Sequence, residues 1–154
     1  MAAEGQTGSK MLDEMPEYRI FELLKKYHYT LTTAESATGG MIASTLINVP
    51  GISAFFTEGY GVVSAETAAD MAVSAARTAD TDAALSVTGV AGPDGGTREC
   101  PVGLVYIGCC LHGRVVTERH LFAGDRMQVR KSATDAALHL LARTITEEGT
   151  ICES

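Results

Sequence analysis

The segment that most constrains the fold of this chain is a junction between a β-like run and a helix, at residues 33–40 (TAESATGG). Upstream, residues 27–33 are rich in β-branched and aromatic side chains, which favour a strand. Downstream, apolar side chains recur at helical spacing. We therefore expect a strand over residues 29–34 and a helix over residues 37–48, with Ser36 as the helix N-cap. This strand–turn–helix order is typical of α/β domains.

Ser36 has two interpretations at this junction. Gly39 and Gly40 carry no Cβ, so a ligand can approach the backbone of the first helical turn closely. The free N–H groups and the positive dipole end of a helix favour an anion or a developing oxyanion there. Ser36 is therefore a candidate nucleophile, with Thr38, Gly39 and Gly40 as candidate substrate-binding residues. The alternative is that Ser36 serves only as a helix cap.

A second glycine-rich loop follows another predicted strand. Residues 83–87 form an apolar, strand-like run that leads into residues 88–96 (TGVAGPDGG). A Gly-Pro-Asp-Gly-Gly sequence is by itself typical of a tight turn. Two such loops, each after a strand, favour a ligand site, because ligands of open α/β sheets lie beyond the carboxyl ends of the strands. The candidate substrate-binding residues of this loop are Thr88, Gly89, Gly92, Asp94, Gly95 and Gly96.

Arg126 and Arg130 lie four residues apart near the predicted start of the last helix, and therefore on one helix face. A cation at a helix N-terminus opposes the helix dipole unless an anionic group compensates for it. Both arginines are candidate ligands for an anionic substrate, and the alternative is that each is a solvated surface charge. The whole chain has a net charge of −7 and a pI near 5.0, which disfavours nucleic acid as a partner.

The rest of the chain alternates helices and strands. We expect a first helix over residues 16–27, a strand over 54–60, a helix capped by Ser64, a hairpin of strands over 102–111 and 115–122, and a last helix over 125–147. This order predicts a three-layer α/β/α sandwich around a mixed, mostly parallel sheet. A chain of 154 residues, 45% of them hydrophobic, can bury one full core. We therefore expect a disordered tail over residues 1–10 and a single domain over residues 11–150.

Other functional classes find little support in the sequence. No apolar run approaches the length of a membrane span, and the first ten residues lack the apolar core of a signal peptide, so we expect a cytoplasmic protein. The four cysteines contain no Cys-x-x-Cys pair, which leaves a metal site unsupported. The four histidines are scattered, and a Ser-His-Asp triad is not favoured.

Several ordered motifs of this chain resemble those of the CinA C-terminal domain family. They are TAESxTGG at 33–40, VPGxS at 49–53, EGY at 58–60, SxTGxAGPDGG at 86–96 with PVG at 101–103, and FxGDRxxVR at 122–130. The resemblance extends from about Leu12 to Glu148, and several motifs in order are far more specific than one glycine loop. Stand-alone members of that family include nicotinamide-nucleotide amidases.

The resemblance implies hydrolysis of the carboxamide of nicotinamide mononucleotide to nicotinate mononucleotide and ammonia. Ser36 would be the nucleophile, and Arg126, Arg130 and the backbone amides of residues 89–96 would hold the phosphate or ribose of the substrate. This chemistry needs no metal or organic cofactor. The expected partner is a small-molecule nucleotide, with no nucleic acid and no membrane, and a domain of this kind is expected to form a homo-oligomer through edge strands or alanine-rich helices.

One departure from the family pattern lies after Tyr60. Family members continue the strand with Thr-Tyr-Ser-Asn and then a short helix that contains a lysine, whereas here Tyr60 is followed directly by residues 61–64 (GVVS). The tyrosine and lysine that the resemblance offers as activators of the serine are therefore absent. Either the chain has lost this segment, or the sequence omits a mobile loop and joins its flanks. The amidase hypothesis therefore stands beside two others, a non-catalytic nucleotide-binding module and a structural or interaction protein.

Overall fold

The computed structural model describes residues 15–46, 48, 49, 52, 55–59, 63–94 and 96–152, with the backbone alone described for residues 56–59, 151 and 152. The elements in chain order are α2 (Pro16–Tyr27), β1 (Leu31–Glu35), α3 (Met41–Leu46), β2 (Phe56–Gly59), α4 (Ala65–Ala79), β3 (Ala83–Gly89), β4 (Leu104–Leu111), β5 (Arg114–Leu121) and α5 (Arg126–Cys152). The tail predicted for residues 1–10 lies outside the described residues.

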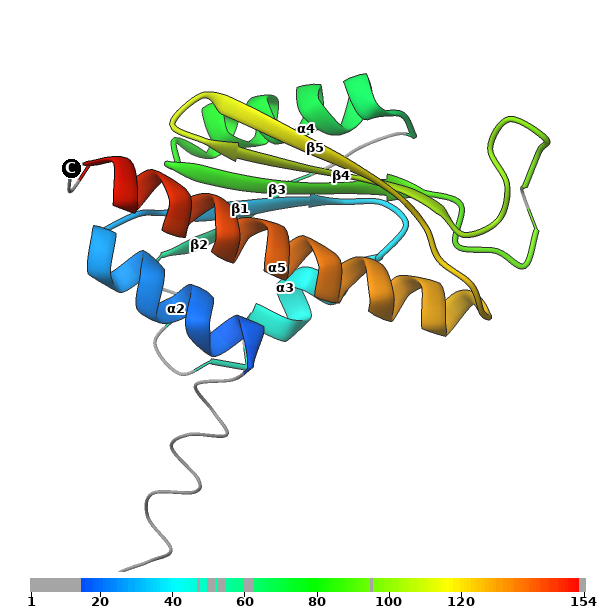
Figure 1. Ribbon diagram of the computed structural model, residues 1–154, viewed down its shortest axis with the longest axis horizontal. Helices are drawn as coiled ribbons and strands as arrows, with labels where there is room; N and C mark the ends of the chain where they lie inside the picture. The colour runs from blue at the N-terminus through cyan, green and yellow to red at the C-terminus, as the bar shows by residue number, and fades with distance from the viewer. Residues whose placement is uncertain are drawn as a thin grey trace, which may run out of the picture.

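The five strands form one sheet in the order β2-β1-β3-β4-β5. β1 pairs in parallel with β2 and β3, whereas β4 pairs antiparallel with β3 and β5, so β4 alone runs against the other four. Figure 1 shows α4 on one face of the sheet and α2, α3 and α5 on the other. The predicted three-layer α/β/α sandwich with a mixed, mostly parallel sheet is confirmed.

α2 spans the predicted residues 16–27. Pro16 fits the first helical turn, where its missing N–H is not needed. Ile20 and Leu24 lie one turn apart and are fully buried, which orients the helix toward the core. The helix ends where His28 adopts a left-handed conformation with φ 56° and donates its backbone N–H to the Leu24 carbonyl. On the same face of the sheet, α2 packs along α5 (Figure 1).

α4 approaches the sheet closely because small residues line its buried face. Ala68, Ala72 and Ala76 recur every four residues and are all buried. Opposite them, Gly108 has no room for a side chain, since a Cβ there would lie 2.5 Å from the Ala68 carbonyl oxygen. The Ser86 hydroxyl donates a hydrogen bond to that same oxygen. The alanine-rich face of α4 therefore sets the thickness of this layer.

The starts of α4 and α5 are fixed by their capping residues. Ser64 Oγ accepts the Thr67 N–H at 3.0 Å, which confirms the predicted cap. Asp125 Oδ1 accepts the Gln128 N–H at 2.9 Å, while Gln128 Oε1 accepts the Asp125 N–H at 2.7 Å. This reciprocal pair is a capping box, so α5 begins one residue after its predicted start.

Adjacent residues of β4 face opposite layers, as the alternation of a strand requires. Cys109 belongs to the core shared with α5, whereas Cys110 belongs to the smaller core beneath α4. Burial raises the pKa of Cys109 to about 12, so this thiol stays protonated and unreactive at neutral pH. The predicted turn after β4 is confirmed, because His112 and Gly113 both have positive φ, 49° and 81°.

The helix after β1 is shorter than predicted. α3 covers Met41–Leu46, whereas the sequence pattern predicted residues 37–48. Gly39 and Gly40 adopt positive φ, 59° and 88°, which a right-handed helix does not contain. Residues 36–40 therefore form a loop between the carboxyl end of β1 and the start of α3, and we call it the Ser36 loop.

Candidate active site

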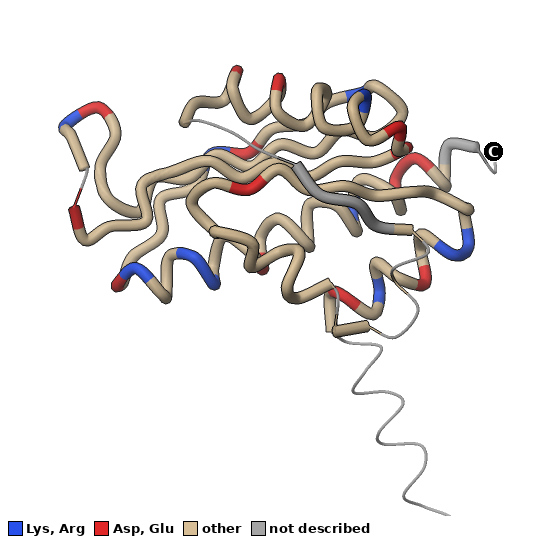
Figure 2. The backbone as a smooth tube through the Cα atoms, turned by 180° about the vertical axis from the view of Figure 1, so that it is seen from behind, with Lys and Arg blue, Asp and Glu red and all other residues tan. Residues whose placement is uncertain are grey.

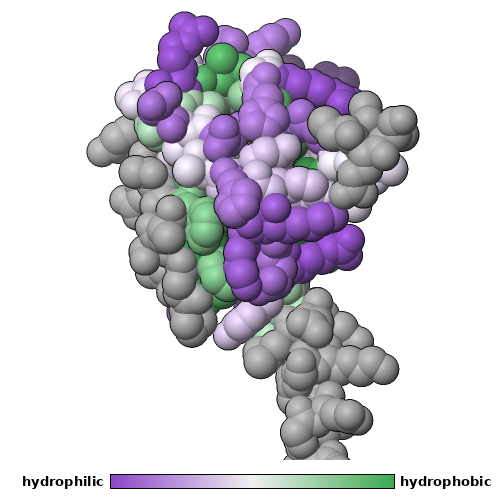
Figure 3. All heavy atoms as spheres, turned by 90° about the vertical axis from the view of Figure 1, so that its left-hand side faces the viewer, coloured by the Kyte–Doolittle hydropathy of each residue, from purple (hydrophilic) through white to green (hydrophobic). Residues whose placement is uncertain are grey.

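The carboxyl ends of β1 and β3 place the two predicted loops side by side. Glu35 at the end of β1 pairs with Val87 of β3, and the Ser36 N–H donates to the Val87 carbonyl at 3.0 Å. The parallel register therefore sets Ser36 beside Thr88. This end of the sheet lies opposite the β4–β5 turn (Figure 1). Figure 3 views the molecule from the turn end, where mainly hydrophilic side chains cover the visible described surface.

Ser36 is exposed, and its hydroxyl makes no hydrogen bond within the described part of the chain. The prediction that Ser36 caps the following helix is wrong, because α3 begins at Met41, five residues later. The hydroxyl is therefore accessible to a ligand. Among the described residues, however, no acceptor that could take the proton of this hydroxyl is hydrogen bonded to it.

The carboxylate of Glu35 occupies the position that was predicted for Ser36. Its Oε2 accepts the Ile42 N–H at 3.0 Å, and its Oε1 accepts the Ala43 N–H at 2.8 Å. Oε2 also accepts the Thr38 hydroxyl at 2.7 Å, so the same carboxylate holds the Ser36 loop from within. The N–H groups of the first turn of α3 are thus taken by the protein's own anion. In the loop itself, the exposed Gly40 N–H has no partner among the described residues.

Arg130 of α5 fixes the Ser36 loop from outside. Its Nε and Nη2 both donate to the Thr38 carbonyl, at 3.0 and 2.7 Å. Gly39 allows this approach, because a Cβ there would lie 3.0 Å from Arg130 Nη2. Thr38 itself is fully buried, and its hydroxyl and carbonyl are both engaged by the protein. The loop is therefore clamped between a carboxylate and a guanidinium.

Arg126 makes the corresponding contact with the second loop, where its Nη1 donates to the Gly92 carbonyl at 3.0 Å. The two arginines thus lie on one face of α5, as predicted, and each anchors one loop. Figure 2 shows basic positions on the first turns of α5. Backbone carbonyl oxygens offset the unfavourable placement of cations at this helix N-terminus. Arg126 Nη2 and Arg130 Nη1 form no hydrogen bond within the described residues, so both remain available to an anionic ligand.

The glycines of the second loop have packing reasons to be glycine. A Cβ at Gly92 would lie 2.6 Å from Val102 Cγ1, one at Gly96 would lie 2.9 Å from Val102 Cγ2, and one at Gly89 would lie 2.5 Å from the Leu104 carbonyl oxygen. Asp94 is exposed, and Gly95 lies outside the described residues. The substrate-binding role predicted for these residues stays a prediction.

Thr88 has an unusual environment beside Ser36. It is fully buried, and its hydroxyl is the one buried side-chain polar atom without a hydrogen-bond partner among the described residues. Leaving a buried hydroxyl unpaired costs about 1–3 kcal/mol. Sequence reasoning singled out Thr88 as a substrate-binding residue. Because Thr88 is buried, a ligand beside the exposed Ser36 does not reach the Thr88 hydroxyl in this conformation.

A cavity of about 540 Å³ opens beside the second loop. Its lining is mainly apolar with one charge of each sign, from Ala91, Pro93, Val102, Gly124, Asp125, Arg126 and Met127. Met127 is 59% exposed, so an apolar side chain stands at the surface here. An apolar ring with a polar substituent suits such a lining. Arg126 joins the cavity to the Gly92 carbonyl and so to the loop.

Metal and histidine chemistry find no support in the described part of the chain. No group of three or more His, Cys, Asp or Glu side chains there is arranged to hold a metal ion. The histidine contacts lie elsewhere: His28 caps α2, His112 lies 3.8 Å from Asp82, His120 lies 3.0 Å from Glu118, and His139 lies 2.6 Å from the Asp135 carbonyl. Within those same residues, no helix is both long enough and apolar enough to cross a membrane.

The fold and the site together define a three-layer α/β domain with an exposed serine after its first strand, in a loop held by an arginine of its last helix. The chain belongs to the CinA C-terminal domain family, whose model matches residues 13–60 and 57–145. The family resemblance of the motifs is thereby confirmed.

Relatives in both sequence and structure carry the same family name or a related one. A relative from Clostridium beijerinckii described as competence-damage inducible is 46% identical over 148 residues, which cover 82% of this chain and 36% of the relative. A CinA-like protein of Kosmotoga olearia is 39% identical over 160 residues, which cover 90% of this chain and 38% of that protein. The chain therefore spans little more than a third of the length of these relatives.

Among solved structures, the competence or damage-inducible protein of Enterobacter asburiae superimposes with a TM-score of 0.80 at 26% identity, covering 84% of this chain and 96% of that one. A competence/damage inducible protein of Agrobacterium tumefaciens gives a TM-score of 0.77 at 29% identity, covering 84% and 92%. The described fold is therefore that of the family's solved members.

The comparisons also indicate that relatives have residues without a counterpart in this chain. The family match divides at residues 57–60. The alignment with the Clostridium beijerinckii relative has 148 positions, whereas 82% of 154 residues is about 126, so about 22 positions of the relative have no counterpart here. The division falls at the Tyr60–Gly61 junction, where the resemblance leads one to expect a tyrosine and a lysine.

Proposed function

We propose that this domain hydrolyses the carboxamide of nicotinamide mononucleotide, with Ser36 as the nucleophile. The observation that carries the proposal is the position of Ser36, an exposed hydroxyl at the carboxyl end of a parallel strand in a loop held from both sides. Ligands of α/β sheets bind beyond these strand ends. Membership of the CinA C-terminal domain family supports the choice of substrate.

The reaction proceeds in two steps through an acyl-enzyme. Ser36 Oγ attacks the carboxamide carbon, the C–N bond breaks, and ammonia leaves with the proton of the serine hydroxyl. Water then hydrolyses the ester on Ser36, which releases nicotinate mononucleotide and restores the hydroxyl. The oxyanion formed in each step needs N–H donors, and the exposed Gly40 N–H is available in the loop. No step requires a metal ion or an organic cofactor.

The substrate would lie between the Ser36 loop and the second loop. The cavity beside Pro93 and Val102 suits the ring or ribose of the nucleotide. Arg126 and Arg130 would use their unpaired N–H groups to hold the phosphate. In this arrangement each arginine has two tasks, because it also donates to a loop carbonyl.

A second candidate function is a nucleotide-binding module without catalysis. Two observations favour it, the absence of a partner for the Ser36 hydroxyl among the described residues and the missing segment at the Tyr60–Gly61 junction. A serine without a general base is a weak nucleophile at neutral pH. Both loops and both arginines would still bind a nucleotide.

Ammonia release separates the two functions. The purified chain is incubated with nicotinamide mononucleotide without added metal, and binding is measured separately by calorimetry. Ser36→Ala is expected to abolish turnover and to keep binding, whereas Ser44→Ala, an exposed serine on α3, is expected to change neither. Binding without turnover by the wild-type chain would establish the binding module instead. Turnover that survives Ser36→Ala would refute Ser36 as nucleophile.

Inserting the family's tyrosine- and lysine-containing segment between Tyr60 and Gly61 tests the role of the missing residues. General-base assistance contributes about 10²–10⁴-fold, so the extended chain is expected to be faster by that order. Equal rates in the two chains would mean that a residue already present, such as Glu35 or Lys131, activates Ser36.

We further propose that the domain works in the cytoplasm as a homo-oligomer. The sheet supports the second point, because β5 is an edge strand whose backbone groups can pair with another copy. Light scattering across a range of protein concentrations tests it, and a monomer at every concentration would refute it.

A further inference from the structure

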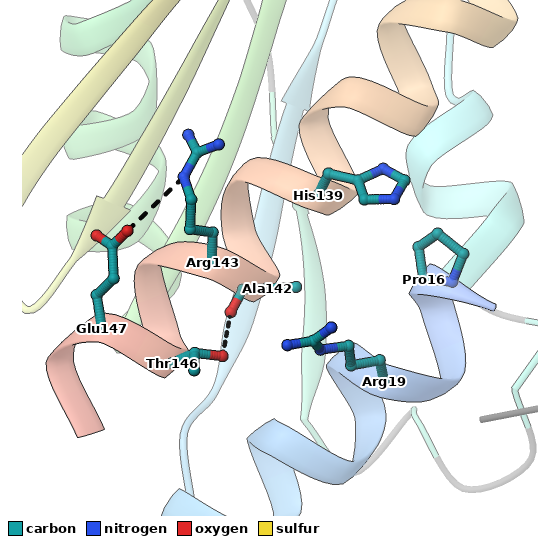
Figure 4. Close-up of a pocket in the computed structure, with 7 residues that line it drawn as sticks. All are labelled: Pro16, Arg19, His139, Ala142, Arg143, Thr146 and Glu147. Carbon is teal, nitrogen blue, oxygen red and sulfur yellow. Dashed lines mark hydrogen bonds and ion pairs between the residues drawn. The ribbon is translucent and has the colours of Figure 1, made fainter. Parts of the chain in front are cut away.

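A second cavity, of about 520 Å³, lies between α2 and α5, and we call it the α2–α5 groove. Its lining residues are Pro16, Arg19, His139, Ala142, Arg143, Thr146 and Glu147. In Figure 4 the guanidinium of Arg19 extends from α2 toward Ala142 and Thr146, and the imidazole of His139 extends from α5 toward Pro16. Each helix thus sends one polar side chain across the groove toward the other.

The groove is separate from the candidate active site. His139 follows Arg130 by nine residues on α5, which is about 13 Å at 1.5 Å per residue. Neither Arg19 nor His139 contacts the Ser36 loop in the described structure. A ligand in the groove therefore does not depend on the chemistry at Ser36.

Arg19 is the cation of the α2–α5 groove that has no ion-pair partner among the described residues. Arg143 donates to Glu118 and lies 3.9 Å from Glu147, so both acids are directed to Arg143 and not to Arg19. Arg19 is exposed and forms no ion pair there. On its own helix, Glu22 is paired with Lys25 at 3.6 Å. Glu17 lies two positions before Arg19, a spacing that does not place two side chains on one helix face.

His139 presents a hydrogen-bond acceptor to the same groove. Its Nδ1 lies 2.6 Å from the Asp135 carbonyl oxygen, and a carbonyl can only accept, so Nδ1 carries the hydrogen. Nε2 is then an acceptor in the neutral ring. The Asp135 carboxylate is itself 3.7 Å from Lys131, and therefore engaged elsewhere. The best ligand for the groove offers oxygens to Arg19 and a proton to Nε2.

We propose that the α2–α5 groove binds a phosphomonoester, with Arg19 on two phosphate oxygens and His139 Nε2 sharing a proton with the third. A phosphomonoester binds its last proton near pH 6, so at neutral pH it can still bring a proton that the Nε2 acceptor receives. A carboxylate is fully ionised at neutral pH and brings no such proton. The carbon skeleton of the ligand packs on Pro16 and Ala142.

The ligand is a soluble metabolite rather than a lipid headgroup. Recognition of anionic membrane surfaces uses clusters of 4–8 basic residues, whereas one unpaired arginine lines this groove. The fork of Arg19 instead suits a single phosphate in bidentate contact.

Titration of the ¹⁵N-labelled chain with glycerol 3-phosphate tests the proposal. We expect saturable shifts of the Arg19, Ala142 and Thr146 amides, weaker binding of acetate, and the same affinity in Ser36→Ala. Arg19→Gln should weaken binding at least tenfold and His139→Gln about threefold, since a charge-assisted contact is worth more than a neutral one. Both side chains are exposed, so the variants are expected to fold. Arg77→Gln, an exposed arginine on α4, is the matched control.

Three outcomes would overturn the proposal. They are the absence of saturation with glycerol 3-phosphate, equal affinity for it in wild type and Arg19→Gln, and a loss of affinity in Arg77→Gln as large as that in Arg19→Gln. Vesicles containing phosphatidic acid form a separate arm. Binding to these vesicles without binding to glycerol 3-phosphate would show that the ligand is a lipid headgroup and would refute a soluble metabolite.

Discussion

Glu35→Ala probes the contact that shapes the Ser36 loop. The carboxylate accepts the backbone N–H groups of Ile42 and Ala43, both of which belong to buried residues, and the hydroxyl of Thr38. Alanine leaves these three donors, and the Thr33 hydroxyl that donates to Oε1 at 3.4 Å, without their acceptor. The variant therefore loses a helix cap and a loop anchor together.

The expected cost follows from the three shorter hydrogen bonds to the Glu35 carboxylate. Each buried donor left unpaired costs about 1–3 kcal/mol, and loss of a helix cap alone costs about 1 kcal/mol. Partial relaxation of the loop lowers the sum, so we expect the free energy of unfolding to fall by about 3 kcal/mol. At about 2–4 °C per kcal/mol for a domain of this size, the melting temperature falls by roughly 6–12 °C.

Urea and thermal unfolding followed by circular dichroism measure this change. Glu35→Gln keeps one carbonyl acceptor and should lose about half as much. Glu99→Ala removes an exposed acid from the second loop region and should stay within about 0.5 kcal/mol of wild type. If Glu35→Ala were as stable as Glu99→Ala, the carboxylate would not be holding α3, and our account of the loop would fail.

Three further outcomes are expected. Thr88→Val removes a buried, unpaired hydroxyl and should raise the free energy of unfolding by up to about 1 kcal/mol in urea titrations, whereas a loss above 1 kcal/mol would mean that the hydroxyl is paired. Nicotinamide riboside, which lacks the phosphate, should be a substrate with a KM at least tenfold higher than that of the mononucleotide. Arg126→Gln should raise the KM of the mononucleotide alone, and an equal rise for both compounds would mean that Arg126 serves only the fold. Burial acts to raise the pKa of Glu118, but hydrogen bonds from Arg143 and His120 outweigh burial and lower this pKa. The ionised carboxylate therefore stabilises the fold above the unfolded pKa of about 4.3, and this stabilisation is lost as the pH falls through the lower pKa of the folded state. Glu118→Gln should therefore lower the melting temperature at pH 7 and approach wild type in acid, and a constant difference at all pH values would contradict this.

The elements that sequence reasoning predicted well are those with a local signal. Pro16 at the start of α2, the Ser64 cap and the His112–Gly113 turn each act within a few residues. The alternation of side chains along β4 is likewise a property of the strand itself. Such features depend on spacing along the chain, and the sequence contains that spacing.

The site was predicted less well, because its contacts join distant residues. The hydrogen bond from Arg130 to the Thr38 carbonyl joins residues 92 positions apart. Its acceptor is a backbone oxygen, which every residue has, so the residue types do not reveal this contact. Glu35 lies seven positions before the Ile42 amide that it accepts, outside the usual capping window. Gly92 and Gly96 were predicted to bind the substrate, and the structure adds a packing reason for both glycines, because Val102 lies where a Cβ would be.

The described hydrogen bonds that shape the Ser36 loop come from β1, β3 and α5. The loop is held by Val87 of β3, by Glu35 at the end of β1 and by Arg130 of α5, and none of these lies near the Tyr60–Gly61 junction in the sequence. Loss of residues between β2 and α4 therefore removes candidate activating groups without removing the scaffold that presents the serine. In the proposed function, nucleotide binding and catalysis would therefore depend on different parts of the chain, so one could be lost while the other is retained.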